Sequence, residues 1–122
     1  MAQTNMVDDL ISSLASLNLP IYRQGSMSAD TAYPTTFITF WNNSTETHSY
    51  YDNSKYGTTW NFDINVYSSD PEAVYTTLES VIENLEKDGW IISGEGHDVV
   101  SDEATHTGRG INALYLKFKK GA

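Results

Sequence analysis

The clearest pattern of apolar positions lies in residues 68–90, SSDPEAVYTTLESVIENLEKDGW. Its apolar residues recur at the spacing of one helical face: Val74, Leu78, Val81, Ile82 and Leu85. We expect a side-chain oxygen of Ser69 or Asp70 to cap the amino end, and the proline that follows suits the first turn. Gly89 is expected to end the helix in the left-handed conformation. The short apolar run at residues 90–92 then predicts a strand.

A second helix is predicted near the amino end, where apolar residues again keep helical spacing: Val7, Leu10, Ile11 and Leu14. We expect Thr4 or Asn5 to cap this helix and Pro20 to end it. Residues 19–25 predict a short extended piece, and residues 26–34 predict a loop.

Three further segments predict strands. Residues 36–41, TFITFW, are rich in β-branched and aromatic residues and are apolar on both faces. Residues 60–67 alternate between an apolar and a polar face: Trp60, Phe62, Ile64 and Val66 against Asn61, Asp63 and Asn65. Residues 111–118 alternate as well, and here we expect Leu114, Leu116 and Phe118 to point inward.

These elements predict a single α+β domain over residues 1–122, in which two helices pack on one face of a mainly antiparallel β-sheet. The other face of the sheet would be polar, since the alternation gives it Asn61, Asp63, Asn65 and Tyr67. Such a face is either solvated or buried against another subunit, and the pattern leaves both interpretations open.

Two connections are longer than the usual hairpin loop of about two to five residues. Residues 42–59 are predicted as a loop that contains Tyr50, Tyr51 and Tyr56. Residues 93–110 are predicted as the second loop. Tyrosine is favoured at interfaces because it offers a large contact area at low entropic cost. The first loop is therefore either an extended hairpin that contacts a partner or a segment that packs over the edge of the sheet.

The charge excludes several kinds of partner. Sixteen acidic residues against seven basic ones give a formal net charge of −9, which repels the phosphate backbone of nucleic acids.

The chain has no cysteine, so disulfides and thiolate metal sites are excluded. No secretory leader and no apolar run of about 20 residues is seen, so we expect a cytoplasmic protein without membrane contact.

The densest group of chemically capable side chains is EGHDVVSDEATH, residues 95–106. It contains the carboxylates of Asp102 and Glu103 between His97 and His106, but it matches no known zinc or calcium spacing. The neighbouring glycines predict a flexible loop that would not hold ligands in place. No serine lies in a nucleophile motif. We expect no catalytic residue, no cofactor and no metal.

The order of these elements resembles the small tail-terminator or tail-completion proteins of long-tailed bacteriophages and prophages. The resemblance rests on LNLPIYRQG, on YPTTFITFW, and above all on FDINVYS followed by the proline-started helix DPEAVYTTLESVIENL. It implies a structural virion protein at the head–tail interface, which forms a homo-oligomeric ring, usually a hexamer. The ring caps the tail tube and joins it to the head connector, and DNA passes through it without specific binding.

The resemblance also implies where the protein acts and which loops touch its neighbours. Assembly would take place in the host cytoplasm, and the finished protein would belong to the virion. The family has no catalytic residues to carry over. By analogy, the two long loops supply the candidate residues for subunit contacts or docking: Tyr50, Tyr51, Asp52, Tyr56, Asp102, Glu103 and Arg109.

Two other functions remain open on the sequence alone. The net charge of −9 also suits a small acidic binding module, an inhibitor or adaptor that captures a basic partner. A metal-dependent enzyme that uses the loop from His97 to His106 is the other alternative.

Overall fold

The structure is a computed structural model that describes residues 6–23, 34–51, 54–101 and 105–118. At Met6, at Glu95 and at the strand ends 46–51, 54–56 and 117–118 it describes the backbone alone. The elements follow one another along the chain as α1 (Met6–Leu14), the 3-10 turn η1 (Ala15–Leu17), β1 (Ile21–Arg23), β2 (Thr36–Tyr51), β3 (Ser54–Ser68), α2 (Pro71–Lys87), β4 (Ile91–Val99) and β5 (Thr107–Phe118).

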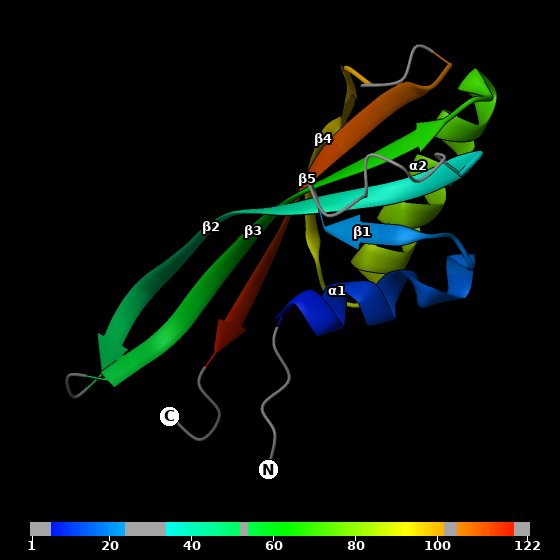
Figure 1. Cartoon of the computed structure of the whole chain (residues 1–122). Coiled ribbons are helices and arrows are strands. Elements are labelled where there is room, and N and C mark those ends of the chain that lie inside the picture. The colour runs from blue at the N-terminus through cyan, green and yellow to red at the C-terminus, as the bar shows by residue number, and fades with distance from the viewer. Residues whose placement is uncertain (1–5, 24–33, 52–53, 102–104, 119–122) are drawn as a thin grey trace.

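The strands form one mixed sheet in the order β1-β2-β3-β5-β4. β1 pairs with β2 in parallel, and the other neighbours pair antiparallel. Both helices lie on the same side of this sheet (Figure 1). The expected α+β class, a mainly antiparallel sheet with two helices on one face, is therefore confirmed.

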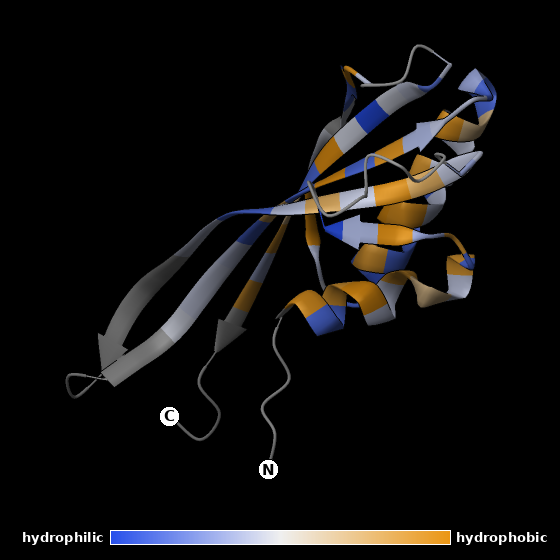
Figure 2. Cartoon of the chain, in the orientation of Figure 1, coloured by the Kyte–Doolittle hydropathy of each residue, from blue (hydrophilic) through white to orange (hydrophobic). Residues whose placement is uncertain are grey.

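The core lies between the helices and the sheet. It combines the apolar stripes of α1 and α2 with the inward residues of β2 and β3, and Figure 2 shows these hydrophobic positions facing one another. The predicted inward set of β3 is confirmed, since Phe62, Ile64 and Val66 are fully buried. Burial of this apolar surface is the main stabilising contribution to such a fold.

Helix α2 follows its sequence prediction closely. Asp70 is the residue that caps it, because its Oδ1 accepts a hydrogen bond of 3.0 Å from the backbone N–H of Glu72. Pro71 occupies the first turn, and Gly89 follows the helix with a φ of 95°. The predicted stripe is buried at Val74, Leu78, Val81 and Leu85, and Ile82 packs half-buried against the core.

Helix α1 is also confirmed, but Pro20 does not end it. The helix ends at Leu14 and passes into η1, after which Asn18 adopts the left-handed conformation with a φ of 56°. The predicted caps, Thr4 and Asn5, lie outside the described residues. The side-chain amide of Asn84 on α2 donates hydrogen bonds to the Ser13 carbonyl and the Ser16 hydroxyl. These bonds hold the end of α1 against α2.

The predicted inward face of β5 is wrong. Ile111 and Ala113 are buried, whereas Leu116 lies on the opposite face and is 41% exposed. The cross-strand register decides which residues of β5 face the core, because buried Ile64 pairs with Ile111 and buried Phe62 pairs with Ala113. The larger leucines outweigh a small alanine in a hydropathy pattern, so the pattern favoured the wrong face. The side chain of Phe118 lies outside the described set.

Both predicted long loops contain strand, and for residues 42–59 the interpretation as an extended hairpin is confirmed. β2 and β3 continue through residues 42–59 as one hairpin, paired as far as Tyr51 with Ser54. β4 extends to Val99, and β5 already begins at Thr107. These segments are polar on both faces and therefore lack the alternation that marks a half-buried strand. Their pairing comes from backbone hydrogen bonds rather than from an apolar face.

Candidate interaction site on the open face of the sheet

One face of the sheet is not covered by the helices, and we call it the open face. Cross-strand register places its residues in rows that run across the strands. One row holds Trp41 of β2, Asp63 of β3 and Asn112 of β5. The open face therefore carries the polar residues that the alternation of β3 predicts.

Hydrogen bonds fix the polar centre of this face. The side-chain amide of Asn112 donates to Oδ1 of Asp63 at 3.0 Å and also to Oδ1 of Asn61. A carboxylate that accepts such a bond has a defined orientation. Asp63 keeps its other carboxylate oxygen without a partner among the described residues.

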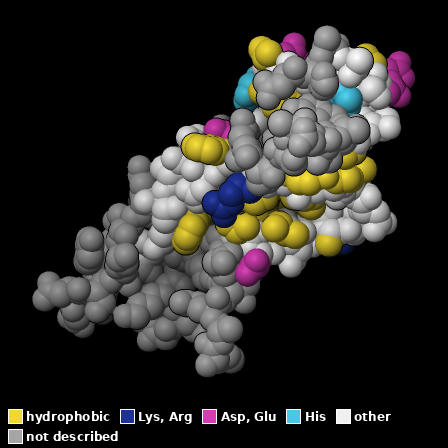
Figure 3. All heavy atoms as spheres, viewed as in Figure 1, with side chains coloured by type: hydrophobic (Ala, Val, Ile, Leu, Met, Phe, Trp, Pro, Cys, Tyr) yellow, Lys and Arg dark blue, Asp and Glu magenta, His cyan; other side chains and the backbone are white. Residues whose placement is uncertain are grey.

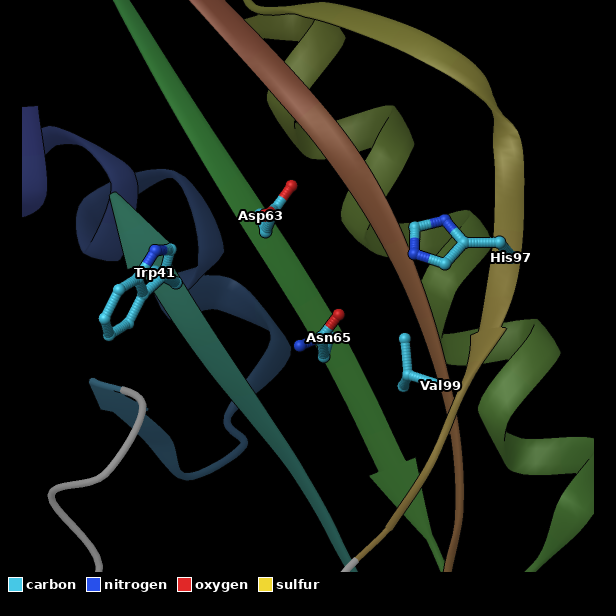
Figure 4. Close-up of a pocket in the computed structure, with 5 residues that line it drawn as sticks. All are labelled: Trp41, Asp63, Asn65, His97 and Val99. Atoms are coloured by element: carbon cyan, nitrogen blue, oxygen red, sulfur yellow. The ribbon is translucent and has the colours of Figure 1, made fainter. Parts of the chain in front are cut away.

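A hollow of about 350 Å³ lies on the open face, and Figure 4 shows its lining. Three strands contribute to the lining: Trp41 from β2, Asp63 and Asn65 from β3, and His97 and Val99 from β4. β5 crosses between β3 and β4 and presents Gly110 between Asn65 and His97. Because glycine has no side chain, the side-chain oxygen of Asn65 can lie directly over this position.

Aromatic side chains close one end of the open face. Phe37 stacks on Tyr67 with ring centroids 5.3 Å apart, and the ring of Tyr22 meets Phe37 edge-on at 6.1 Å. The ring of His106 lies 5.9 Å from that of Phe37, and its Nε2 forms a hydrogen bond of 2.8 Å with the Pro34 carbonyl oxygen. This end of the face is packed rather than open.

The opposite end of the open face exposes large apolar side chains. Trp41 is 52% exposed, Ile91 is 59% exposed, and Leu116 lies on the same face. Ile91 pairs across the sheet with Leu114, which places apolar groups beside the polar row of Asn112. Exposed apolar groups around polar ones are a usual composition of protein interfaces.

The second feature is an arm, which we define as residues 43–51 of β2 and 54–59 of β3. In Figure 1 the arm projects beyond the body that the helices cover. At about 3.3 Å per residue, residues 43–51 span about 30 Å. β5 accompanies β3 only as far as the pair of Phe118 with Gly57.

The predicted docking residues have different positions. Tyr50, Tyr51 and Tyr56 lie in the strands of the arm, where the backbone alone is described. Asp52, Asp102 and Glu103 lie outside the described residues.

Arg109 is described in full, and it lies on the helix side of the sheet. Its guanidinium donates to Oδ1 of Asp98 at 2.9 Å and to the Gly96 carbonyl oxygen at 3.2 Å. The same group lies over the ring of Tyr75 on α2, 5.1 Å from its centroid. These contacts tie β5 to β4 and α2, so they give Arg109 a structural role within the chain.

The histidines of the predicted loop are separated. His97 lies in β4 on the open face, whereas His106 bonds to Pro34 at the aromatic end. Figure 3 shows the described histidine side chains at two distinct places on the body. Among the described residues, no group of three or more His, Asp or Glu side chains is placed to hold a metal ion.

The hollow was not predicted from the sequence. Its residues come from three strands, and strand order is needed to bring β4 and β2 to opposite sides of it. One signal was available: Gly108 and Gly110 alternate within a strand, which often marks a close approach of neighbouring groups. Both glycines lie on the open face, beneath Tyr67 and Asn65.

Comparison of the sequence with protein-family models gives no match, and comparison with curated proteins gives none either. In the described part of the chain, neither helix has the length and apolar character needed to cross a membrane.

Proposed function

We propose that this chain is a structural virion protein that assembles as a ring at the head–tail interface of a long-tailed phage. The ring would cap the tail tube and join it to the head connector. The observation that carries this proposal is the arm, whose β2 strand is about 30 Å long by its rise per residue and whose outer part projects beyond the helix-covered body (Figure 1). A paired hairpin without helices over it is an element suited to contact a neighbouring molecule.

The edge of the arm supports the same function. β1 pairs with β2 only at residues 38–40, and the outer edge of β2 beyond Phe40 has no strand partner among the described residues. Such an edge presents unpaired backbone N–H and C=O groups, which can bind the strand of another subunit. When the contact joins two different surfaces of identical copies, it closes into a ring if the rotation permits.

The charge of the helix layer supports the passage of DNA. Residues 70–88 contain six acidic residues and one lysine, and all seven of these side chains are exposed. In the view of Figure 3 the described acidic side chains lie at the margins of the body. An acidic ring does not retain phosphates, because affinity for nucleic acid depends on cationic side chains that displace counterions.

The proposal is tested with a variant that lacks the arm. Because Glu46 pairs with Thr59, replacing residues 47–58 with Asn-Gly gives a two-residue hairpin turn at a position already in register. The helices and their buried stripes remain in the variant. We expect a folded monomer that no longer associates with tail tubes, as measured by circular dichroism and native mass spectrometry. The matched control is Glu79→Gln, an exposed change on α2.

Electron microscopy of tails assembled without the protein provides the second readout. A missing terminator leaves tubes of uncontrolled length, and the complete protein should restore a uniform length. Tails of normal length without the protein would contradict the proposal. Salt-sensitive capture of a basic protein, without ring formation in the presence of tubes, would favour the acidic binding module instead.

A further inference from the structure

The hollow on the open face collects polar groups that the chain itself leaves without partners. The second carboxylate oxygen of Asp63, the Asn65 amide, the His97 ring and the Trp41 indole N–H form no hydrogen bond among the described residues. Beside them, Thr39 is only 8% exposed, and its hydroxyl also has no partner in the described part of the chain. Groups of this kind, held around one hollow, are available to a ligand.

The charge and shape of one end of the hollow select the ligand. Trp41 and Asp63 are cross-strand partners, so their side chains stand side by side on the open face at a spacing of about 5 Å between Cβ atoms. The indole face attracts a cation, and the carboxylate attracts the same cation more strongly. An anion would be repelled by the carboxylate of Asp63. An apolar group would remove water from this carboxylate without replacing the lost hydrogen bonds.

A guanidinium uses this pair more fully than an ammonium does. It is flat, so it can lie on the indole ring while its N–H groups donate to a carboxylate in the same plane. Asn112 holds the carboxylate of Asp63 from the far side with its amide, which leaves the unpartnered oxygen for the ligand.

The size of the site indicates a side chain on a protein surface rather than a free small molecule. Trp41 on β2 and His97 on β4 are separated by three strand spacings, or about 14 Å. Only the end at Trp41 and Asp63 suits a single guanidinium. Elsewhere on the open face, Ile91 on β4 and Leu116 on β5 expose apolar groups that the same partner surface can cover.

We propose that this hollow binds an arginine side chain of a partner protein, with its guanidinium on the indole of Trp41 and against the carboxylate of Asp63. The acidic chain, with its net charge of −9, complements such a basic partner. The inference depends on the hollow alone. It does not require that the chain form a ring, because the arm and the hollow are separate features.

The probe for this site is N-acetyl-L-arginine amide, compared with N-acetyl-L-citrulline amide, which has nearly the same shape but no charge. Titration is followed by the NMR signal of the Trp41 indole N–H, which the Trp41→Phe variant identifies. We expect a saturable shift with a dissociation constant in the millimolar range and binding of the citrulline analogue at least about tenfold weaker. Asp63→Asn should also weaken arginine binding at least about tenfold, because it removes the charge and keeps the shape.

The matched control is Glu79→Gln, which removes one negative charge from the exposed face of α2 and should leave binding unchanged. Equal affinity for citrulline, or unchanged affinity in Asp63→Asn, would overturn the proposal. Equal affinity for N-acetyl-L-lysine amide would overturn the assignment to a guanidinium. Absence of a saturable shift when the wild-type protein is titrated with the arginine probe would overturn the proposal, and this measurement does not depend on the folding of any variant. None of these binding results bears on tail length, which is measured separately.

Discussion

Asn65 and Gly110 are cross-strand partners, and the side-chain oxygen of Asn65 occupies the space that a Cβ at residue 110 would need. The position of the Asn65 side chain, which lines the hollow, therefore depends on the absence of a side chain at residue 110. We expect Gly110→Ala to lower the free energy of unfolding by about 1–3 kcal/mol, since the added methyl group forces its neighbour aside. Urea unfolding at equilibrium measures this change.

The clash at Gly110 has a direct control, because Asn65→Ala removes the atom that causes it. We expect the double variant to recover part of the stability that Gly110→Ala loses, with an interaction energy of about 0.5–3 kcal/mol. Strictly additive effects of the two substitutions would contradict the close contact between these residues.

The cap of α2 gives a second prediction. Asp70 accepts the bond from the backbone N–H of Glu72, and Ser69 is exposed and makes no side-chain bond among the described residues. We expect Asp70→Ala to lower the free energy of unfolding by about 0.5–2 kcal/mol. Ser69→Ala is the matched control and should change it by less than about 0.5 kcal/mol. A larger loss in the serine variant would reverse the assignment. Thermal unfolding followed by circular dichroism measures both.

The sequence predicts those parts of the fold in which local pattern and tertiary packing agree. In α2 the cap, the proline and the buried stripe of Val74 to Leu85 all lie within one helix, so each can be read without knowing its neighbours. The alternation of β3 is equally clear, because Phe62, Ile64 and Val66 form the centre of the core.

The remaining features depend on contacts between distant segments. Pairing with β3 decides which face of β5 points to the core. The hydropathy pattern of β5 cannot show this, because it has the small Ala113 on one face and two leucines on the other. The arm consists of polar strands held by backbone pairing, which composition alone presents as a loop. The hollow needs β4, β5, β3 and β2 in their observed order, so no single stretch of sequence contains it.

The amide of Asn112 gives a third prediction. It bridges Asn61 and Asp63 on the open face and also approaches the Phe62 carbonyl oxygen at 3.4 Å. We expect Asn112→Asp to destabilise the fold more than Asn112→Ala does, because the new carboxylate faces that of Asp63 directly across the strands. Urea unfolding in low and high salt distinguishes the loss of the amide hydrogen bonds, which both variants share, from the charge repulsion in the aspartate variant alone. The additional loss in the aspartate variant should shrink as salt screens the repulsion, and a loss independent of salt would contradict it.

The phase of β5 gives the fourth prediction, since the two faces of one strand differ sharply in burial. Ile111 is 1% exposed and packs in the core, whereas Leu116 is 41% exposed on the open face. We expect Ile111→Ala to lower the free energy of unfolding by about 2–5 kcal/mol, because it removes buried methyl groups and leaves a cavity. Leu116→Ala removes a similar number of atoms from the open face and should cost less than about 1 kcal/mol, because less apolar area is removed from water there. The comparison is made by urea unfolding with tryptophan fluorescence. A larger loss at Leu116 than at Ile111 would mean that β5 turns its leucines to the core after all.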